Sequence, residues 1–279
     1  MFMDTDLLNN CNIKIENKLT AKITDKLPKP IIYSASKYGI ESKYTGNGVK
    51  IVILDSGYPR HKDIKIEGEK VSFCEDNMNA DDKVGHSTLV SGIIKSNNKN
   101  AIVGLAPLSR IYYGKVVNNR KQCSFNALIA GILWSIVKEV DIIVLALGTQ
   151  YDYTVFHDAI KKANAYGMII LAAGGDNISE KSVEIDYPAR YKEVFSTGYL
   201  TRSKIKNQII KEKVDFCLGG SSLYTTYLNN KYVRVSGSSV STSFFAGLAA
   251  LYVERYKKYD NNKKKISSLV YSDLLKISM

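Results

Sequence analysis

The chain has 279 residues, of which 45% are hydrophobic and 24% charged, and its formal net charge is +12. This length accommodates one large α/β domain or two small ones with a buried core, and the apolar fraction excludes a disordered chain. The positive charge favours an acidic partner. The basic residues are scattered, however, and no zinc-finger spacing or RNA-binding aromatic signature accompanies them. We therefore expect a lysine-rich surface and no nucleic-acid partner.

No part of the sequence is suited to spanning a membrane or directing export. The longest apolar runs, such as Ile142 to Gly148, are far shorter than the roughly 20 residues that a membrane-spanning helix needs. Asp4 and Asp6 stand where a signal peptide carries positive charge. The cysteines lie too far apart to share a metal-ligand spacing, and they are Cys11, Cys74, Cys123 and Cys217. We expect reduced cysteines, a cytoplasmic protein and no membrane partner.

Strand and helix patterns alternate along most of the chain. Several apolar runs have the unbroken hydrophobicity of parallel strands buried on both faces. They are Lys50–Leu54, Ile111–Val117, Asp141–Leu147, Gly167–Ala173 and Val194–Leu200. Segments with a helical pattern are Ser87–Lys95, Asn126–Glu139, Val155–Tyr166 and a long apolar stretch from Val240 to about Tyr256. The alternation predicts an α/β fold with a doubly wound, mostly parallel sheet and helices on both faces.

The composition indicates a single domain with short flanking segments. Residues 1–29 are polar, lack sustained periodicity and end in prolines that break a helix, which is typical of a connector. Residues 30–257 carry the alternating pattern and form the predicted domain. Residues 258–279 are a lysine-rich segment with a short helix. Within the domain, Arg202 to Arg234 is more polar and richer in glycine and β-forming residues.

Three short segments place a reactive side chain at a strand end or a helix start. In Val49–Gly57, Asp55 follows a buried strand, at the edge where ligands bind in open α/β sheets. In Gly85–Gly92, His86 begins a helix. In Ser236–Gly247, Ser239 begins a helix whose backbone N–H groups favour negative charge. Taken singly, each segment has a plainer interpretation as a turn, a structural histidine or a helix cap.

Taken together, the segments have the order Asp, His, Ser, which distinguishes one architecture of serine protease from the others. From about Pro30 to Lys257 the chain resembles the subtilisin-like serine proteases. Further matching segments are His61-Lys62-Asp63-Ile64, Val103–Pro107, Ala130–Trp134, Ala146-Leu147-Gly148, Ala172-Ala173-Gly174 and Tyr187-Pro188. The resemblance implies that Ser239 is the nucleophile, that His86 is the general base and that Asp55 orients the imidazole.

The resemblance also implies where a peptide substrate binds. Ala146 and Gly148 would pair with the substrate backbone, and Ala173 and Gly174 would line the same cleft. Asp186 matches the floor of the first specificity pocket, where a carboxylate would pair with Arg or Lys. We therefore expect cleavage after a basic residue. The plainer interpretation of Asp186 is a surface loop residue.

The sequence departs from the family pattern at the oxyanion hole. Gly175 stands where the family has an asparagine that stabilises the oxyanion. A local insertion could bring Asn177 back to the hole, and this is the interpretation we favour. The alternatives are Asp176 or backbone N–H groups alone, including that of Ser239. Ser243-Phe244 replaces a Pro-His pair, and Ser87-Thr88-Leu89 replaces a Gly-Thr-His sequence.

A loop that binds calcium in many relatives reads Ser96-Asn97-Asn98-Lys99-Asn100, with a lysine and no carboxylate. Because calcium prefers carboxylate oxygens, we expect no metal site here and no required cofactor, while a weak calcium site elsewhere stays open. The predicted partner is a peptide or protein substrate. One hypothesis is removal of an acidic leader from a lanthipeptide-type bacteriocin precursor, with residues 1–29 lying across the cleft. The alternatives are general intracellular protein turnover and a non-catalytic peptide-binding pseudoprotease.

Overall fold

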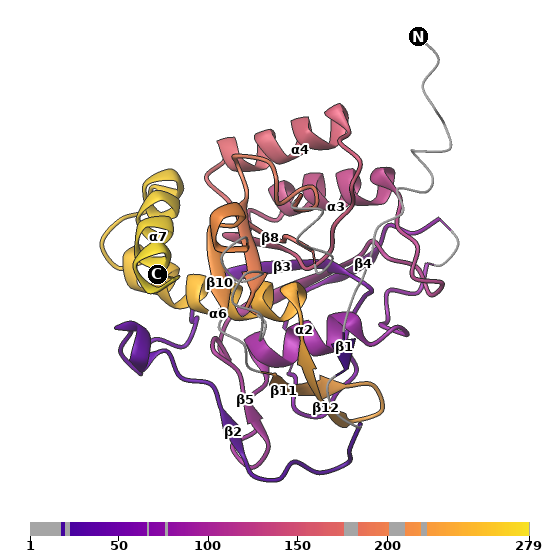
Figure 1. Cartoon of the computed structure of the whole chain (residues 1–279), viewed down its shortest axis with the longest axis vertical. Helices are drawn as coiled ribbons and strands as arrows, with labels where there is room; N and C mark the ends of the chain where they lie inside the picture. Colours follow the sequence, from indigo (N-terminus) through magenta and orange to yellow (C-terminus); the bar gives the residue numbers. More distant parts are fainter. Residues whose placement is uncertain are drawn as a thin grey trace.

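A seven-stranded parallel sheet crosses the centre of the molecule (Figure 1). The computed structural model describes residues 18–19, 23–65, 67–75, 78–175, 184–200, 210–218 and 222–278. In spatial order the strands are β10 (Phe216–Leu218), β9 (Phe195–Tyr199), β8 (Ile169–Ala173), β7 (Ile142–Leu145), β3 (Lys50–Asp55), β6 (Arg110–Lys115) and β4 (Lys70–Ser72). Every adjacent pair is parallel. The predicted α/β fold with a mostly parallel sheet is therefore confirmed.

Helices cover both faces of this sheet, as the apolar runs predict. Alternate residues of β3 point to opposite faces. Ile51 and Ile53 pack in one core with α2 (His86–Lys95) and α6 (Ser238–Lys257). Val52 and Leu54 pack in the other core with α3 (Phe125–Val137) and α4 (Thr154–Ala165). Because both faces are buried, the strand has no polar face, and this explains its unbroken apolar sequence.

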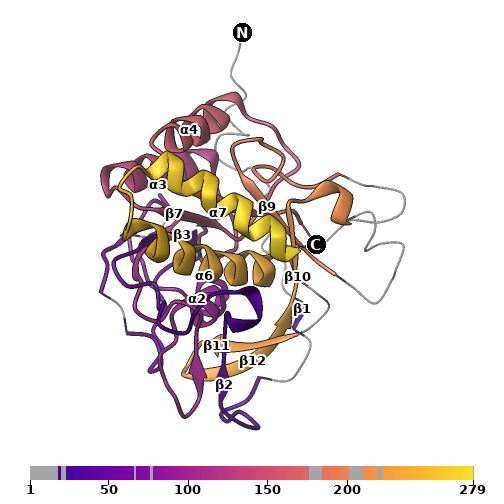
Figure 2. The same cartoon turned by 90° about the vertical axis from the view of Figure 1, so that its left-hand side faces the viewer.

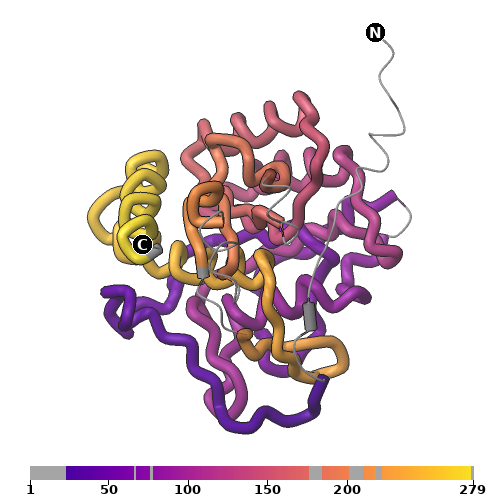
Figure 3. The backbone as a smooth tube through the Cα atoms, viewed as in Figure 1, coloured from indigo at the N-terminus to yellow at the C-terminus, as the bar shows by residue number. Residues whose placement is uncertain are grey.

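The remaining elements lie around this central layer. A small antiparallel sheet has the order β1 (Lys18–Leu19), β12 (Lys231–Ser236), β11 (Leu223–Tyr227). The short strands β2 (Ile31–Ile32) and β5 (Ile102–Val103) pair in parallel. The chain from β2 through the 3₁₀ helix η1 (Ser36–Tyr38) to β3 runs along the outside of the domain, as the tube in Figure 3 shows.

The chain ends in α7 (Lys263–Ser278), which lies alongside α6 (Figure 2). This helix is longer than the short helix expected there, with 16 residues. Val270 and Leu274 of α7 are fully buried in the core that α6 also joins. The carboxyl-terminal helix therefore packs as part of the same core.

Close packing of α2 on the small sheet depends on a glycine. The hydroxyl of Thr225 donates to the carbonyl of Leu89 at 2.6 Å, and that of Thr226 donates to the carbonyl of Thr88 at 2.8 Å. A Cβ on Gly92 would collide with both hydroxyls. Only a residue without a side chain lets the helix and β11 approach this closely. In the described part of the chain, no helix is long and apolar enough to cross a membrane.

Candidate active site

Asp55 and His86 meet at the carboxyl edge of the sheet. Asp55 is the last residue of β3 and is fully buried, and His86 is the first residue of α2 and only 2% exposed. The imidazole Nδ1 lies 2.8 Å from Oδ1 and 2.7 Å from Oδ2 of Asp55. Because an ionised carboxylate can only accept a hydrogen bond, Nδ1 carries the proton and Nε2 is left as the basic nitrogen.

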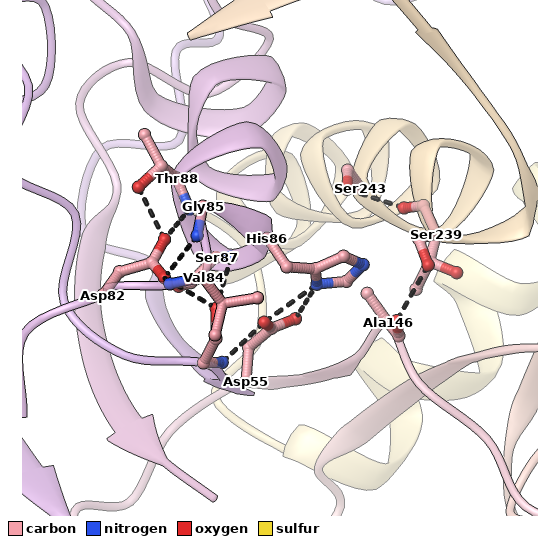
Figure 4. Close-up of polar contacts among 12 residues, drawn as sticks. Asp55, Asp82, Val84, Gly85, His86, Ser87, Thr88, Ala146, Ser239 and Ser243 are labelled. Carbon is pink, nitrogen blue, oxygen red and sulfur yellow. Dashed lines mark hydrogen bonds and ion pairs between the residues drawn. The ribbon is translucent and has the colours of Figure 1, made fainter. Parts of the chain in front are cut away.

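Ser239 lies on the other side of the imidazole. Figure 4 shows the ring of His86 extending from Asp55 toward Ser239. Among the described residues, the buried Nε2 of His86 has no hydrogen-bond partner. The hydroxyl of Ser239 donates to the carbonyl of Ala146 at 2.8 Å. The structure thus brings the carboxylate, the imidazole and the hydroxyl predicted from the sequence to one place, although the residues are far apart in the chain.

Ser239 is held by the start of α6. It is the second residue of this helix, and Gly237, with φ of 143°, precedes the helix. The hydroxyl of Ser243 donates to the carbonyl of Ser239 at 2.7 Å, so the serine in place of the family's proline bonds back to the preceding turn. Phe244 packs edge-on against Tyr38, with ring centroids 5.7 Å apart. Both departures from the family pattern are therefore accommodated within the helix and its packing.

The other two histidines have different partners. The Nε2 of His61 lies 3.1 Å from the carbonyl of Lys231, and burial lowers the pKa of His61. The Nε2 of His157 lies 2.9 Å from a carboxylate oxygen of Glu193, and its ring stacks on Tyr191 with centroids 3.8 Å apart. Both have structural roles, which leaves His86 as the imidazole of the site.

Asp186 lies against two glycine-containing segments that follow β7 and β8. A Cβ on Gly148 would come within 2.6 Å of the Cβ of Asp186, and a Cβ on Gly175 within 2.6 Å of its Oδ2. The N–H of Asp186 donates to the carbonyl of Gly174 at 3.0 Å. Two predicted substrate-binding positions, Gly148 and Gly174, thus lie against Asp186, and the other two, Ala146 and Ala173, precede them in the same two segments.

The sequence analysis missed one contact of this carboxylate. The side-chain amide of Gln150 donates to Oδ1 of Asp186, and Arg190 lies 3.4 Å from the amide oxygen of the same glutamine. Gln150 follows the Ala-Leu-Gly segment, but nothing in its local sequence indicates a partner 36 residues away. The carboxylate is therefore oriented by a neighbouring side chain.

The asparagine predicted for the oxyanion hole lies outside the described residues. Asn177 and the alternative Asp176 both fall in 176–183. Gly175 is described, and its φ is +91°. A side chain at this position would be strained and would meet Oδ2 of Asp186. Gly175 and Asp186 are therefore sterically linked.

The loop expected to lack calcium ligands is joined by a carboxylate from elsewhere in the chain. Asp63 accepts from the side-chain amide of Asn98 at 2.7 Å through Oδ1, and from the hydroxyl of Tyr232 at 2.5 Å through Oδ2. Burial and the Asp63 carboxylate raise the pKa of Tyr232, so it stays a hydrogen-bond donor. The side-chain oxygen of Asn98 accepts from the N–H of Asn100. These groups satisfy one another's hydrogen bonds.

No cluster of three or more His, Cys, Asp or Glu suited to a metal ion occurs in the described parts of the chain. No disulfide joins the described cysteines to one another, and these are Cys74, Cys123 and Cys217. The groups that meet at the site are a carboxylate, an imidazole and a hydroxyl, which support nucleophilic attack on a carbonyl carbon.

Comparison with known proteins points to one family. The sequence model of the subtilase family matches residues 46–274. A thermostable alkaline protease of Halalkalibacterium halodurans is 30% identical over 90% of this chain and 70% of its own length. An intracellular serine protease of Paenibacillus polymyxa is 32% identical over 74% of this chain and 67% of its own length. The minor extracellular protease Epr of Bacillus subtilis is 35% identical over 76% of this chain, which spans about a third of that larger protein.

Proposed function

Because the chain belongs to the subtilase family and is a subtilisin-like serine endopeptidase, we propose that Asp55, His86 and Ser239 are its catalytic triad. The Asp55–His86 contact and the position of Ser239 beyond the imidazole support this assignment. Nδ1 of His86 is held by a carboxylate, so Nε2 can take the proton of the Ser239 hydroxyl. The hydroxyl oxygen then attacks the carbonyl carbon of the peptide bond, and the same imidazole protonates the leaving amine.

The negative charge that develops on the carbonyl oxygen needs donors. The backbone N–H of Ser239, at the start of α6, is one such donor, because the N-terminus of a helix favours negative charge. We assign the second donor to Asn177. The steric link between Gly175 and Asp186 supports this choice, because position 175 cannot carry an amide side chain.

The assignment of the triad predicts the behaviour of Ser239→Ala. This substitution is expected to abolish peptide hydrolysis and labelling by a fluorophosphonate probe, because both need the hydroxyl as nucleophile. Ser243→Ala is the matched control, since it removes a hydroxyl one helical turn away and leaves Ser239 in place. Full labelling of Ser239→Ala would refute the assignment, and an unlabelled wild-type protein would favour the pseudoprotease hypothesis.

We further propose that the substrate residue before the cleaved bond is basic. Asp186 places a carboxylate directly against Gly148 and Gly175, the glycines that follow β7 and β8. A guanidinium would donate two hydrogen bonds to this carboxylate, and an ammonium would bind it through one donor. The Gln150 amide already fixes the orientation of the carboxylate.

Asp186→Asn tests this specificity, because it keeps the shape of the side chain and removes its charge. The preference for Arg over Leu before the cleaved bond, measured as the ratio of kcat/KM values for two peptides, is expected to fall by about 10–100-fold. Asp158→Asn, on an exposed position of α4, should leave the ratio unchanged. Equal rates of the wild-type protein on both peptides would contradict the proposal.

We also propose that the fold needs no calcium at the Ser96–Asn100 loop. The hydrogen bonds of Asp63 with Asn98 and Tyr232 connect this loop to the rest of the fold without an ion. Asp63 is buried, so its carboxylate depends on these donors. The contacts between side chains thus stabilise the loop in place of an ion.

EDTA is therefore expected to leave the thermal unfolding midpoint unchanged. Tyr232→Phe should lower the free energy of unfolding by about 1–3 kcal/mol, because it leaves a buried carboxylate oxygen without its donor. Tyr259→Phe, at an exposed tyrosine, is the control and should have no effect. A midpoint that falls with EDTA and recovers with added calcium would contradict the proposal.

Within this activity, the role we propose is removal of an acidic leader from a bacteriocin-type precursor in the cytoplasm. The hairpin after β6 carries the exposed cations Arg120 and Lys121, and it begins beside Asp55, whose carbonyl accepts from the N–H of Val117 at 3.2 Å. A leader that enters along this hairpin would meet positive charge before it reaches the triad.

This role predicts a higher kcat/KM at low salt for a peptide with Asp and Glu before the cleavage site than for the same peptide with Asn and Gln at those positions. The advantage should shrink as salt rises, because screening weakens attraction between exposed charges. Arg120→Ser with Lys121→Ser should remove most of it, whereas Lys258→Ser with Lys264→Ser, the same change of charge elsewhere, should not. Equal rates for the two peptides would favour general protein turnover.

The position of residues 1–29 across the cleft stays a prediction. Strand β1 pairs antiparallel with β12, with Lys18 opposite Ser236, three residues before Ser239. Residues 1–17 lie outside the described part of the chain. The pairing supports our proposal that residues 1–29 return toward the cleft.

A further inference from the structure

The two residues that share the Asp–His contact belong to different elements, and a second carboxylate joins these elements. Asp55 ends β3, and His86 begins α2, 31 residues later. Asp82 lies in the loop before α2 and is 5% exposed. It accepts five hydrogen bonds, all from neutral donors in the described residues. A buried carboxylate held in this way has little freedom to move, because each lost bond would leave charge unsatisfied.

One set of these bonds fixes the start of α2. Oδ2 of Asp82 accepts from the backbone N–H of Thr88 at 2.9 Å and from its hydroxyl at 2.6 Å. Oδ1 accepts from the N–H groups of Val84 at 3.0 Å and Gly85 at 2.8 Å. The N-cap residue Gly85 has no side chain to cap the helix, so Asp82 supplies the missing acceptor. Figure 4 shows Asp82 among these groups, on the far side of α2 from Ser239.

The other bond leads to the strand that carries Asp55. The hydroxyl of Ser56 donates to Oδ1 of Asp82 at 2.9 Å and accepts from the N–H of Ser87 at 2.9 Å. The N–H of the same serine donates to Oδ1 of Asp55 at 2.6 Å. Ser56 therefore touches the catalytic carboxylate, the residue after His86 and Asp82 at once. A helix cap alone would not need this serine.

The neighbouring Lys115 fixes the same serine from the opposite side. Its buried ammonium donates to the carbonyl of Ser56 at 2.6 Å, and Lys115 lies beside Asp55 in the register of β6 and β3. The backbone N–H, the hydroxyl and the carbonyl of Ser56 are thus all bonded. Every polar atom of this serine is hydrogen-bonded. We therefore expect a displacement of Asp82 to displace Asp55 and His86 as well.

We propose that Asp82 is a positioning residue of the protease, which sets the geometry of the Asp55–His86 pair through Ser56 and the first turn of α2. It touches neither substrate nor the reacting atoms. The inference rests on the proposed triad. Proton transfer between Ser239 and His86 depends on orientation, and a displacement of about 1 Å can cost about 10²-fold in rate.

Asp82→Asn tests this role. The amide can still accept from Ser56, Val84 and Gly85, but its NH₂ group faces the N–H of Thr88, which cannot accept a hydrogen bond. We expect kcat for a peptide substrate to fall by about 10²-fold, with KM changed by less than about twofold. The proton NMR resonance of the His86 Nδ1–H should shift or broaden, because the Asp55–His86 hydrogen bond changes geometry.

Ser56→Ala removes only the bridging hydroxyl and carries the same test if Asp82→Asn fails to fold. It should lower kcat in the same way, and the loss in the double variant should be smaller than the product of the two single losses, because both act on one network. Asp141→Asn is the matched control. Asp141 is equally buried and accepts from the N–H of Lys50 at 2.8 Å, but it precedes β7 at the opposite edge of the sheet. It should lose stability and keep wild-type kcat.

The outcomes separate this inference from the proposed function. Wild-type protein without hydrolytic activity would refute the proposed triad, while the NMR resonance would still report whether Asp82 positions His86. An active wild type with an equally active Asp82→Asn variant would overturn the inference. So would a loss of kcat no larger than that of Asp141→Asn, or a loss with an unmoved Nδ1–H resonance.

Discussion

The hydrogen bond between the carboxylate of Asp55 and the imidazole of His86 is the constraint around which the site is arranged. Both groups are buried, so each needs a partner to offset the loss of water. The contact also decides the tautomer of the imidazole, and with it the face that Nε2 presents to Ser239. Sheet, helix and loop contacts all serve to hold this pair at the carboxyl edge of the parallel strands.

Helix α2 connects the parts of the site. Its first turn is bound to the end of β3 through Ser56 and Asp82, and its middle is bound to β11 through two threonine hydroxyls. The next strand, β12, leads through Gly237 directly into the helix of Ser239. The position of the imidazole relative to the hydroxyl is therefore set by packing between regular elements. Such packing is stiffer than a loop, because interiors are close-packed and resist small displacements.

The residues at which the chain departs from the family pattern contact side chains from other segments. Gly175 adjoins Asp186, and a side chain at position 175 would collide with that carboxylate. The Ser96–Asn100 loop lacks its own carboxylate. The carboxylate of Asp63, from elsewhere in the chain, accepts hydrogen bonds from Asn98 in this loop and from Tyr232. In both places a single substitution would leave a clash or an unsatisfied buried group. Gly175 and the Ser96–Asn100 loop are therefore explained only together with the residues that they contact.

Local sequence was enough to find the sheet and to propose the reactive residues. The unbroken apolar runs gave β3, β7 and β8 to within a few residues, because strands buried on both faces need no polar side chains. The order Asp55, His86, Ser239 and the small residues around each were visible along the chain. The polar stretch from Arg202 to Arg234 was less informative, since its strand β10 has only three residues and β11 is only partly buried.

Only the tertiary structure decided which distant side chains satisfy one another. The acceptors for the first turn of α2 come from Ser56 and Asp82, and the loop carboxylate comes from Asp63. The partner of Asp186 is Gln150. Periodicity reports how a segment buries its own apolar face, and it is silent on hydrogen bonds between segments that meet only after folding. The sequence by itself determined the fold and led to the proposed reactive groups, whereas the contacts that orient those groups arise from packing.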